Sequence, residues 1–297
     1  MRILSPVPYS LAAIALTLIC LPQLTLAQEP TGPFQLYKAG KRVLYSAQAL
    51  TPIAIDGDLG DWPATDTLRL NVEQPHSPLH HGILSGAADM DILLVTAWTD
   101  SLFYFAARVY DDVHQTEGKE AYRAFQVDGL APYFDLDHDE DDSGIFWQGD
   151  HYFWITAEPE RKPGTLWWGP GSAEGYRYTP NFDPVPGLNY AVQLLDDGYI
   201  MEVSIAMGSN GLAANSADWR PPFLGRTIGF MLVAVDKDDA RNLPFGEMVR
   251  LSEGDGSYDW GEIAWCGSDD RQSGWGNLVF IDRYDPDKHR LHPRYLE

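Results

Sequence analysis

The sequence predicts an all-β protein, folded as an antiparallel β-sandwich. Segments rich in β-branched and aromatic residues, bounded by Gly, Pro, Asn and Asp, recur from Val43 to Ile281. Two pairs of these segments are joined by short turns, at Thr99–Ser101 and at Asp196–Gly198, as in β-hairpins. No helical periodicity extends beyond a few turns, and 44% of the 297 residues are hydrophobic, which is enough to fill a core.

The expected strands follow one another along the chain. Asp91–Asp112 holds a hairpin whose second arm is apolar on both faces, which is typical of a central strand covered on both sides. The other expected strands are Gly129–Leu136, Asp150–Thr156, Tyr190–Leu195, Tyr199–Ile205, Thr227–Val235, Glu247–Leu251 and Asn277–Ile281. We therefore expect one sandwich over residues 43–283, after a polar linker at 28–42 and before a charged surface tail at 284–297.

The first 27 residues have the pattern of a signal peptide. Arg2 gives a positive start, Leu11–Leu21 is a short apolar run, and a small-residue cleavage site ends at Ala27. The run is shorter than the roughly 20 apolar residues that a transmembrane helix needs. The alternative, a lipoprotein signal at Cys20, fits less well because a bulky isoleucine precedes that cysteine. We expect a secreted or periplasmic protein whose mature chain keeps one cysteine, Cys266, and so has no intramolecular disulfide.

The charge of the chain restricts its partners. There are 43 Asp and Glu residues against 21 Lys and Arg, a formal net charge of −22. Such an excess of negative charge repels phosphate backbones, so nucleic-acid binding is not expected. It also disfavours anionic membrane surfaces. Neutral ligands and cations are the binding partners that this charge allows.

Short motifs occur in a fixed order between Ile55 and Ile281. They are IDGDLGDW at 55–62, AWTDSLFY at 97–104, VYDD at 109–112, DGLAPYFD at 128–135, GYIMEVSIA at 198–206, IGF at 228–230 with VDKDD at 235–239, and WGNL at 275–278. In this order they resemble the family 9 carbohydrate-binding modules, a group within the DOMON-like class of jelly-roll β-sandwiches. The resemblance implies a non-catalytic protein that binds a glycan and is associated with glycan-degrading enzymes.

The resemblance also implies where a sugar would bind. In that family two aromatic rings clamp the terminal sugar, one just before the Asp of the mid-chain strand and one in the loop before the last strand. Phe125 holds the first place, and Trp265 is the nearest ring for the second. Trp167 and Trp168 are two further rings in a segment rich in Gly and Pro, where we expect an exposed loop.

The polar half of that sugar site is different here. The position of the family's acidic sugar contact holds Ala131, and the position of its arginine on the next strand holds Trp154. We therefore include Trp154 among the candidate ligand-binding residues and expect a sugar site that has diverged.

A dense acidic segment predicts a structural calcium site. Alternating aspartates can turn several carboxylate oxygens toward one hard cation, although the Gly and the closing Glu of an EF-hand are not at their positions. The candidate ligands are Asp135, Asp137, Asp139, Asp141 and Asp142. The alternative is a solvated acidic turn. A smaller group, Asp236, Asp238 and Asp239, has the same two interpretations.

Two other functions remain open. The DOMON-like class includes haem b carriers, for which Met90, Met207 or Met248 would be an axial ligand opposite Lys237 or His114. The other alternative is an accessory module of a glycan-degrading system, or a hydrolase, although no nucleophile-elbow, zinc-protease or phosphate-loop motif occurs.

Overall fold

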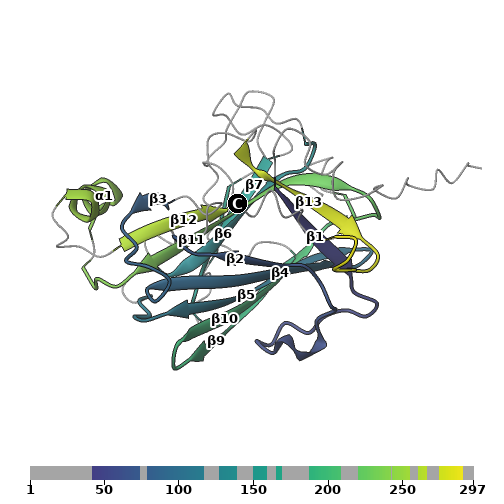
Figure 1. The fold of residues 1–297 in the computed structure, drawn as a ribbon, viewed down its shortest axis with the longest axis horizontal. Coiled ribbons are helices and arrows are strands. Elements are labelled where there is room, and N and C mark those ends of the chain that lie inside the picture. Colours follow the sequence, from purple (N-terminus) through teal and green to yellow (C-terminus); the bar gives the residue numbers. More distant parts are fainter. Residues whose placement is uncertain are drawn as a thin grey trace, which may run out of the picture.

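The structure, a computed structural model, describes residues 42–73, 79–116, 127–138, 150–158, 165–168, 187–208, 220–241, 243–254, 260–265 and 274–289. The expected signal peptide and nearly all of the expected linker lie outside these residues. The described part is built almost wholly of strands (Figure 1). They are β1 (Val43–Gln48), β2 (Thr67–Leu70), β3 (Leu79–Gly82), β4 (Met90–Trp98), β5 (Leu102–Asp111), β6 (Gly129–Asp135), β7 (Asp150–Thr156), β8 (Thr165–Trp168), β9 (Leu188–Leu195), β10 (Gly198–Ala206), β11 (Thr227–Lys237), β12 (Trp260–Trp265) and β13 (Gly276–Ile281). A 3-10 turn at Leu59–Asp61 and the helix α1 (Phe245–Gly254) complete the described elements.

The strands form two layers, which confirms the predicted β-sandwich. Hydrogen bonds join the 13 described strands into one continuous sheet that curls into these layers. Neighbouring strands follow the order β8-β7-β6-β11-β12-β3 in one layer and β9-β10-β5-β4-β1-β13 in the other, with β2 paired to β4. In Figure 1, β9, β10, β5 and β4 lie below β6, β11 and β12. The long strand β11 joins the layers, because Thr227–Phe230 pairs with β13 and Leu232–Lys237 pairs with β12. Pairing is antiparallel except where β1 meets β13 and β4.

The main core lies between the layers. Phe103 on β5 packs edge-on against Phe134 on β6, with ring centroids 5.6 Å apart, and against Phe230 on β11 at 6.3 Å. β5 does not pair with β6 or β11, so these contacts cross from one layer to the other. All three rings are fully buried, and their burial is a main source of the free energy that holds the layers together.

Two of the sequence motifs meet in one buried contact. Glu202 on β10 accepts hydrogen bonds from the backbone N–H groups of Asp56 and Gly57 and from Trp62 Nε1, the last at 2.6 Å. Gly57 has a φ of +91°, a left-handed backbone that glycine adopts most readily. The segment that precedes β2 is thus fixed to β10 by one carboxylate, which gives the IDG and GYIMEV motifs a structural role.

The prediction of a strand after β11 is wrong. Glu247–Leu251 lies inside the helix α1, which starts where the N–H groups of Glu247 and Met248 bond to the carbonyl of Pro244. Met248 and Leu251 are three residues apart, a helical spacing, and both pack onto the sandwich. So short an apolar run does not by itself distinguish a helix from a strand.

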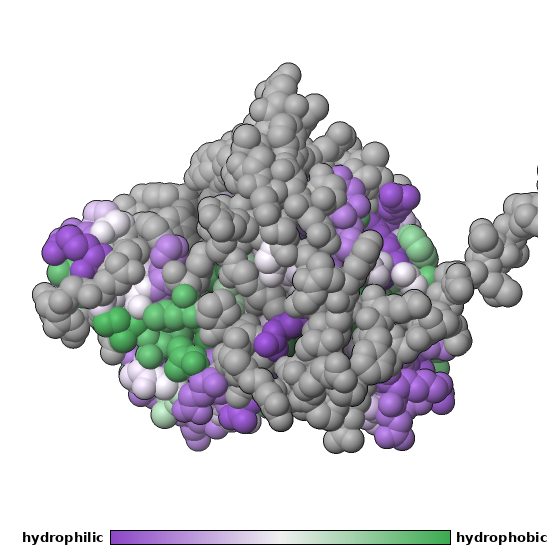
Figure 2. All heavy atoms as spheres, turned by 45° about the horizontal axis from the view of Figure 1, so that its top comes forward, coloured by the Kyte–Doolittle hydropathy of each residue, from purple (hydrophilic) through white to green (hydrophobic). Residues whose placement is uncertain are grey.

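The start of the predicted tail packs on the sandwich. The ring of His289 lies 4.6 Å from that of Tyr45 on β1, and Tyr284 donates a hydrogen bond to Asp66 at 3.3 Å. On the face drawn in Figure 2, the coloured surface is largely hydrophilic, and its most extensive apolar area lies at the left. Among the described residues, no helix is both long and apolar enough to cross a membrane.

Candidate functional site

A second apolar cluster, here called the outer-face cluster, covers the side of β6, β7, β11 and β12 that points away from the main core. Tyr133 and Tyr152 stand opposite each other on β6 and β7, and their rings stack with centroids 4.6 Å apart and planes 4° apart. Tyr133 also meets Trp275 edge-on at 5.7 Å. The buried members are Ala131, Tyr133, Trp154, Met231, Val233, Val235, Met248, Trp260, Ala264 and Trp275, with Tyr152, Leu243 and Leu251 packed against them.

The two positions at which the sequence departs from the family's polar contacts both belong to this cluster. Ala131 is fully buried, and Trp154 is 7% exposed. Alternation along a strand places Ala131 with Tyr133 on β6 and Trp154 with Tyr152 on β7. Two buried apolar side chains therefore stand where the family resemblance implies a carboxylate and a guanidinium.

The prediction that Trp265 lies in an exposed loop is wrong. It is the last residue of β12, it is 1% exposed, and it belongs to the main core. Its ring packs 6.1 Å from Phe230 and lies over Gly276, where a Cβ atom would collide with the indole. Alternation along β12 turns Trp265 inward and Trp260 outward, so the Trp265 ring has no face for a ligand.

The other predicted aromatic residues are only partly described. Trp167 and Trp168 belong to the short strand β8 and not to a loop, and in the β7–β8 ladder Trp168 stands opposite Tyr152. The structure does not describe their side chains. Phe125 lies outside the described residues.

Two of the predicted acidic residues, Asp135 and Asp137, lie in the described part of the chain, at the end of β6. Asp135 and Asp150 form a cross-strand pair between β6 and β7, and each is 1% exposed. Carboxylate oxygens of Asp135, Asp150 and the exposed Asp137 lie within 4.8 Å of one another, which is close enough for one metal ion. We call these three residues the Asp135 group. The remaining predicted ligands, Asp139, Asp141 and Asp142, lie outside the described residues.

A larger group of carboxylates, here called the buried acidic cluster, lies at the other end of β6. Only part of this cluster is predictable from the sequence, because its members come from the turn before β4, the end of β5, the start of β6 and the end of β11. Its members are Asp89, Asp111, Asp112, Asp128, Asp236 and Asp238, with His114 beside them.

Burial changes the proton affinity of this cluster. It raises the pKa of Asp128 to about 7, and it raises the pKa of Asp236 well above its ordinary value, with a further contribution from Asp128 and Asp111. His114 Nδ1 lies 3.3 Å from Asp128 Oδ2. Although burial lowers the pKa of His114, the nearby Asp128 and Asp111 carboxylates raise it above its ordinary value.

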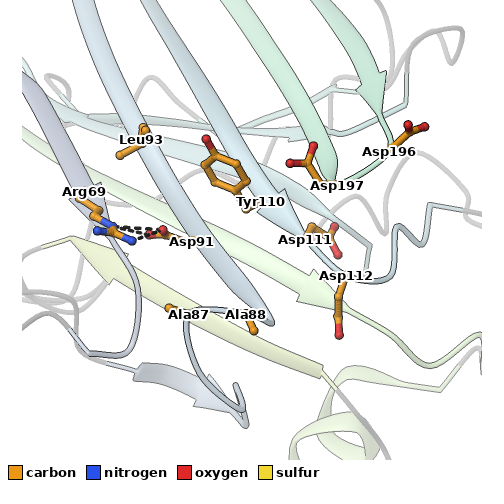
Figure 3. A pocket seen from close by; sticks show the side chains of 10 residues that line it. All are labelled: Arg69, Ala87, Ala88, Asp91, Leu93, Tyr110, Asp111, Asp112, Asp196 and Asp197. Atoms are coloured by element: carbon orange, nitrogen blue, oxygen red, sulfur yellow. Dashed lines mark hydrogen bonds and ion pairs between the residues drawn. The ribbon is translucent and has the colours of Figure 1, made fainter.

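A pocket of about 730 Å³ opens on the outer face of the other layer (Figure 3). Arg69 and Asp91 pair on one side, with Nε and Oδ1 2.9 Å apart, and Asp197 lies on the other side of Tyr110. The guanidinium of Arg108 lies 4.1 Å from the centre of the Tyr110 ring. Sequence reasoning did not find this pocket, because its residues are separated along the chain.

The methionines considered as haem ligands are packing residues. Met90 and Met207 belong to the main core, and Met248 belongs to the outer-face cluster. Each is at most 2% exposed. Methionine commonly fills a core in this way.

The described residues thus form a β-sandwich with an aromatic outer-face cluster and two groups of clustered carboxylates. Residues 71–244 match the family described as "Carbohydrate family 9 binding domain-like", and because this is more than half of the chain, the protein belongs to that family. A comparison with curated proteins finds no match.

Two solved structures of a family 9 carbohydrate binding module from Caldicellulosiruptor kristjanssonii are similar to this chain. The structure in complex with glucose is 17% identical, with a TM-score of 0.48, and the match covers 82% of this chain and 98% of that one. The structure in complex with cellotriose is also 17% identical, with a TM-score of 0.49, and the match covers 85% and 100% of the two chains.

Proposed function

We propose that the protein is an exported, non-catalytic module that binds a neutral sugar over β6, β7 and β8. The observation that carries this proposal is the stacked pair Tyr133–Tyr152, which lies in the same outer-face cluster as Ala131 and Trp154. These are the two positions where the family resemblance implies sugar contacts. Membership of the carbohydrate-binding family supports the ligand class.

Stacking is the main interaction in this proposal. The apolar C–H face of a pyranose packs on an aromatic ring, and of the stacked pair Tyr152 is the more exposed. Trp168 stands opposite Tyr152 in the β7–β8 ladder and is the next candidate contact, and the family resemblance implies Phe125 as the second ring of the clamp. Because Ala131 and Trp154 replace a charged pair, we expect recognition to depend less on hydroxyl contacts and to discriminate weakly between neutral hexoses.

We further propose that the Asp135 group holds a structural calcium ion, with Asp139, Asp141 and Asp142 completing its ligands. Two buried carboxylates directly opposite each other on neighbouring strands repel, and a cation between them relieves that repulsion. Oxygen ligands from several carboxylates suit calcium. The site would stabilise the end of β6 and the start of β7, beside the sugar platform.

Affinity electrophoresis in gels that contain a soluble glucan tests the sugar site. Tyr152→Ala should weaken retardation by about tenfold or more, since the stacking of a nucleic-acid base on one aromatic ring, the nearest analogue of a sugar face on a ring, contributes about 1–3 kcal/mol. Tyr110→Ala is the matched control, because Tyr110 is a partly exposed tyrosine on the opposite layer. Loss of retardation in Tyr110→Ala but not in Tyr152→Ala would place the ligand in the Arg69–Tyr110 pocket instead.

A further inference from the structure

We propose that the Arg69–Tyr110 pocket of Figure 3 is a second ligand site, and that it binds a glycan bearing primary ammonium groups, such as an oligomer of glucosamine. The pocket lies on the outer face of the layer that contains β2, β4 and β5, whereas the proposed neutral-sugar site lies on the other layer. The two proposals are independent, because they involve different residues and different ligands.

Strand alternation places the floor of the pocket on the outer face of its layer. Ile92 and Val109 are buried in the main core, so their neighbours Asp91 and Tyr110 point the opposite way. Asp91 and Tyr110 stand directly opposite each other on β4 and β5, and Arg69 on the neighbouring strand β2 donates to Asp91. The turn before β4 and the turn between β9 and β10 line the sides of the pocket. Paired strands thus fix the floor.

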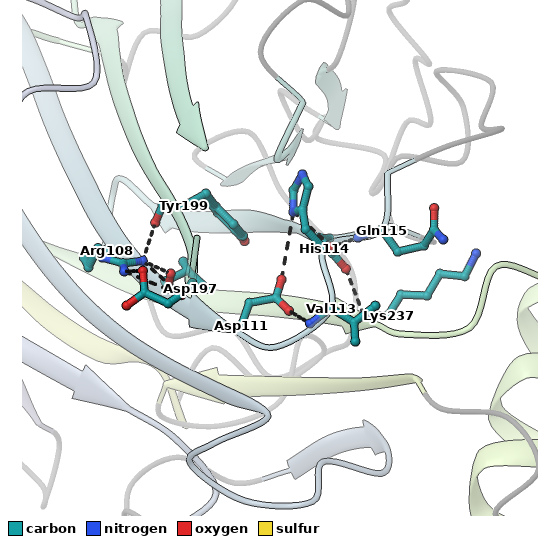
Figure 4. Close-up of polar contacts among 10 residues, drawn as sticks. Arg108, Asp111, Val113, His114, Gln115, Asp197, Tyr199 and Lys237 are labelled. Carbon is teal, nitrogen blue, oxygen red and sulfur yellow. Dashed lines mark hydrogen bonds and ion pairs between the residues drawn. The ribbon is translucent and has the colours of Figure 1, made fainter. Parts of the chain in front are cut away.

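Tyr110 provides an aromatic surface that is held in place from one side. The guanidinium of Arg108 lies 4.1 Å from the centre of the ring, and the Arg108 side chain is only 14% exposed. Arg108 also forms an ion pair with Asp197 and donates to the carbonyl of Tyr199 at 3.4 Å (Figure 4). Tyr110 lines the pocket and is 37% exposed. Its ring therefore offers a fixed surface for the apolar C–H face of a sugar.

The charge of the pocket lining is strongly negative. The lining residues with charged side chains are Arg69, Asp91, Asp111, Asp112, Asp196 and Asp197. Asp91 pairs with the one guanidinium of the lining, and Asp197 pairs with Arg108. Asp112 and Asp196 are exposed, and in the described part of the chain neither forms an ion pair with a basic side chain. These two carboxylates favour a ligand with positive charge.

The guanidinium in the lining does not make the pocket a site for acidic sugars. Nε of Arg69 lies 2.9 Å from Oδ1 and 3.1 Å from Oδ2 of Asp91, and Nη2 also donates to Oδ2. Asn71 donates a further hydrogen bond to Oδ1 at 2.9 Å, which fixes this carboxylate in place. An acidic ligand would have to displace Asp91 from the guanidinium, and the other aspartates would repel it.

The size of the pocket favours a small molecule over a bare ion. Its volume of about 730 Å³ lies within the range of about 300–1,000 Å³ that is typical of ligand pockets. A glucosamine oligomer combines a C–H face for Tyr110 with ammonium groups for Asp112 and Asp196. Membership of a carbohydrate-binding family supports a sugar as the carrier of those groups.

Calorimetry with tri-glucosamine tests the proposal on the full chain, at about pH 6, where exposed aspartates are ionised. Every titration contains the same calcium concentration, so that the occupancy of the Asp135 group does not vary. Asp112→Asn combined with Asp196→Asn should weaken binding at least about tenfold, because it removes both carboxylates that lack a cation. Tyr110→Ala should weaken binding by a similar factor, because it removes the stacking surface.

The matched control for the double variant is Asp282→Asn combined with Asp287→Asn. It removes the same number of exposed charges from the segment after β13, and its affinity should stay within about twofold of wild type because distant exposed charges are screened by salt. Equal losses of affinity in the two double variants would show only the effect of net charge and would overturn the proposal. Wild-type affinity in the double variant of the pocket, or no binding of tri-glucosamine by wild type, would also overturn it.

Cellotriose distinguishes this site from the proposed neutral-sugar site, because it carries a hydroxyl group where tri-glucosamine carries each amine. Tyr152→Ala should weaken the binding of cellotriose and keep a site for tri-glucosamine, whereas the double variant of the pocket should do the reverse. Binding of tri-glucosamine without binding of cellotriose would support the pocket and contradict the neutral-sugar site. Loss of tri-glucosamine binding in Tyr152→Ala but not in Tyr110→Ala would overturn the assignment of the pocket.

Discussion

Asp135 and Asp150 face each other across the β6–β7 ladder, and each is 1% exposed. Like charges in directly opposite positions destabilise a sheet unless something neutralises them. At a calcium concentration of about 100 times the dissociation constant, a bound ion should raise the unfolding free energy by about 2.7 kcal/mol. Asp150→Asn should abolish most of this increase, as measured by chemical denaturation with and without calcium.

The matched control for this prediction is Asp282→Asn, at an exposed carboxylate beyond β13. Its response to calcium should equal that of wild type. An equal calcium response in Asp150→Asn and wild type would show that the Asp135 group is solvated rather than metal-bound.

Glu202→Ala should strongly destabilise the fold. The substitution leaves the N–H groups of Asp56 and Gly57 and the indole N–H of Trp62 without their acceptor. We expect the unfolding free energy to fall by about 3–5 kcal/mol, measured by urea denaturation. Glu73→Ala, at an exposed glutamate, should change it by less than about 0.5 kcal/mol. Similar small changes in both variants would contradict the structural role of Glu202.

Asp66 should make stability depend on pH. Burial raises its pKa to about 6, although hydrogen bonds from Tyr45 and Tyr284 lower it. The folded state therefore holds this proton up to a higher pH than the unfolded state does, so stability falls as pH rises through the interval between about 4 and 6. The total loss is about 3 kcal/mol.

Asp66→Asn tests this dependence, because the amide does not titrate. The difference in unfolding free energy between the variant and wild type should shift in favour of the variant as pH rises from about 4 to 7, and then remain constant. Parallel curves for the two proteins across that range would show that Asp66 has an ordinary pKa in the folded state.

Trp265→Phe should lower the stability of the fold without changing its affinity for sugar. The Trp265 ring packs against Phe230 and over Gly276 in the main core, so a smaller ring leaves a cavity. The unfolding free energy should fall by about 2 kcal/mol or more, whereas the affinity for cellotriose should stay within about twofold of wild type. A selective loss of sugar affinity, with stability unchanged, would restore Trp265 as a ligand contact.

Strand position was predictable where the alternation of residues was strong. Asp150–Thr156 was predicted with its observed bounds, and the Asp196–Gly198 turn joins β9 to β10 as expected. The prediction of secondary structure failed in short segments, in which the residue spacing does not distinguish a helix, a strand and a loop. Glu247–Leu251 has an apolar spacing that also fits a helix, and Trp167, Trp168 and Trp265 lie in short strands beside glycines that indicate loops.

The sites were harder to predict than the strands. Asp135 and Asp137 are predictable as a pair because they are two residues apart in the sequence, whereas Asp150 joins them only through the β6–β7 register. In the same way Asp111 and Asp238 are separated by most of the sandwich sequence and meet only in the folded chain. Such contacts are set by strand pairing, which local patterns do not specify.

The most direct test of the central proposal is a crystal structure of the full chain soaked in cellotriose, with calorimetry on the same protein. We expect a pyranose ring stacked on Tyr152 beside β8, and binding that Tyr152→Ala weakens by about tenfold or more. Density for the sugar in the pocket between Arg69 and Tyr110, or no heat of binding with cellotriose or any other neutral sugar, would contradict a sugar site on the outer face of β6 and β7.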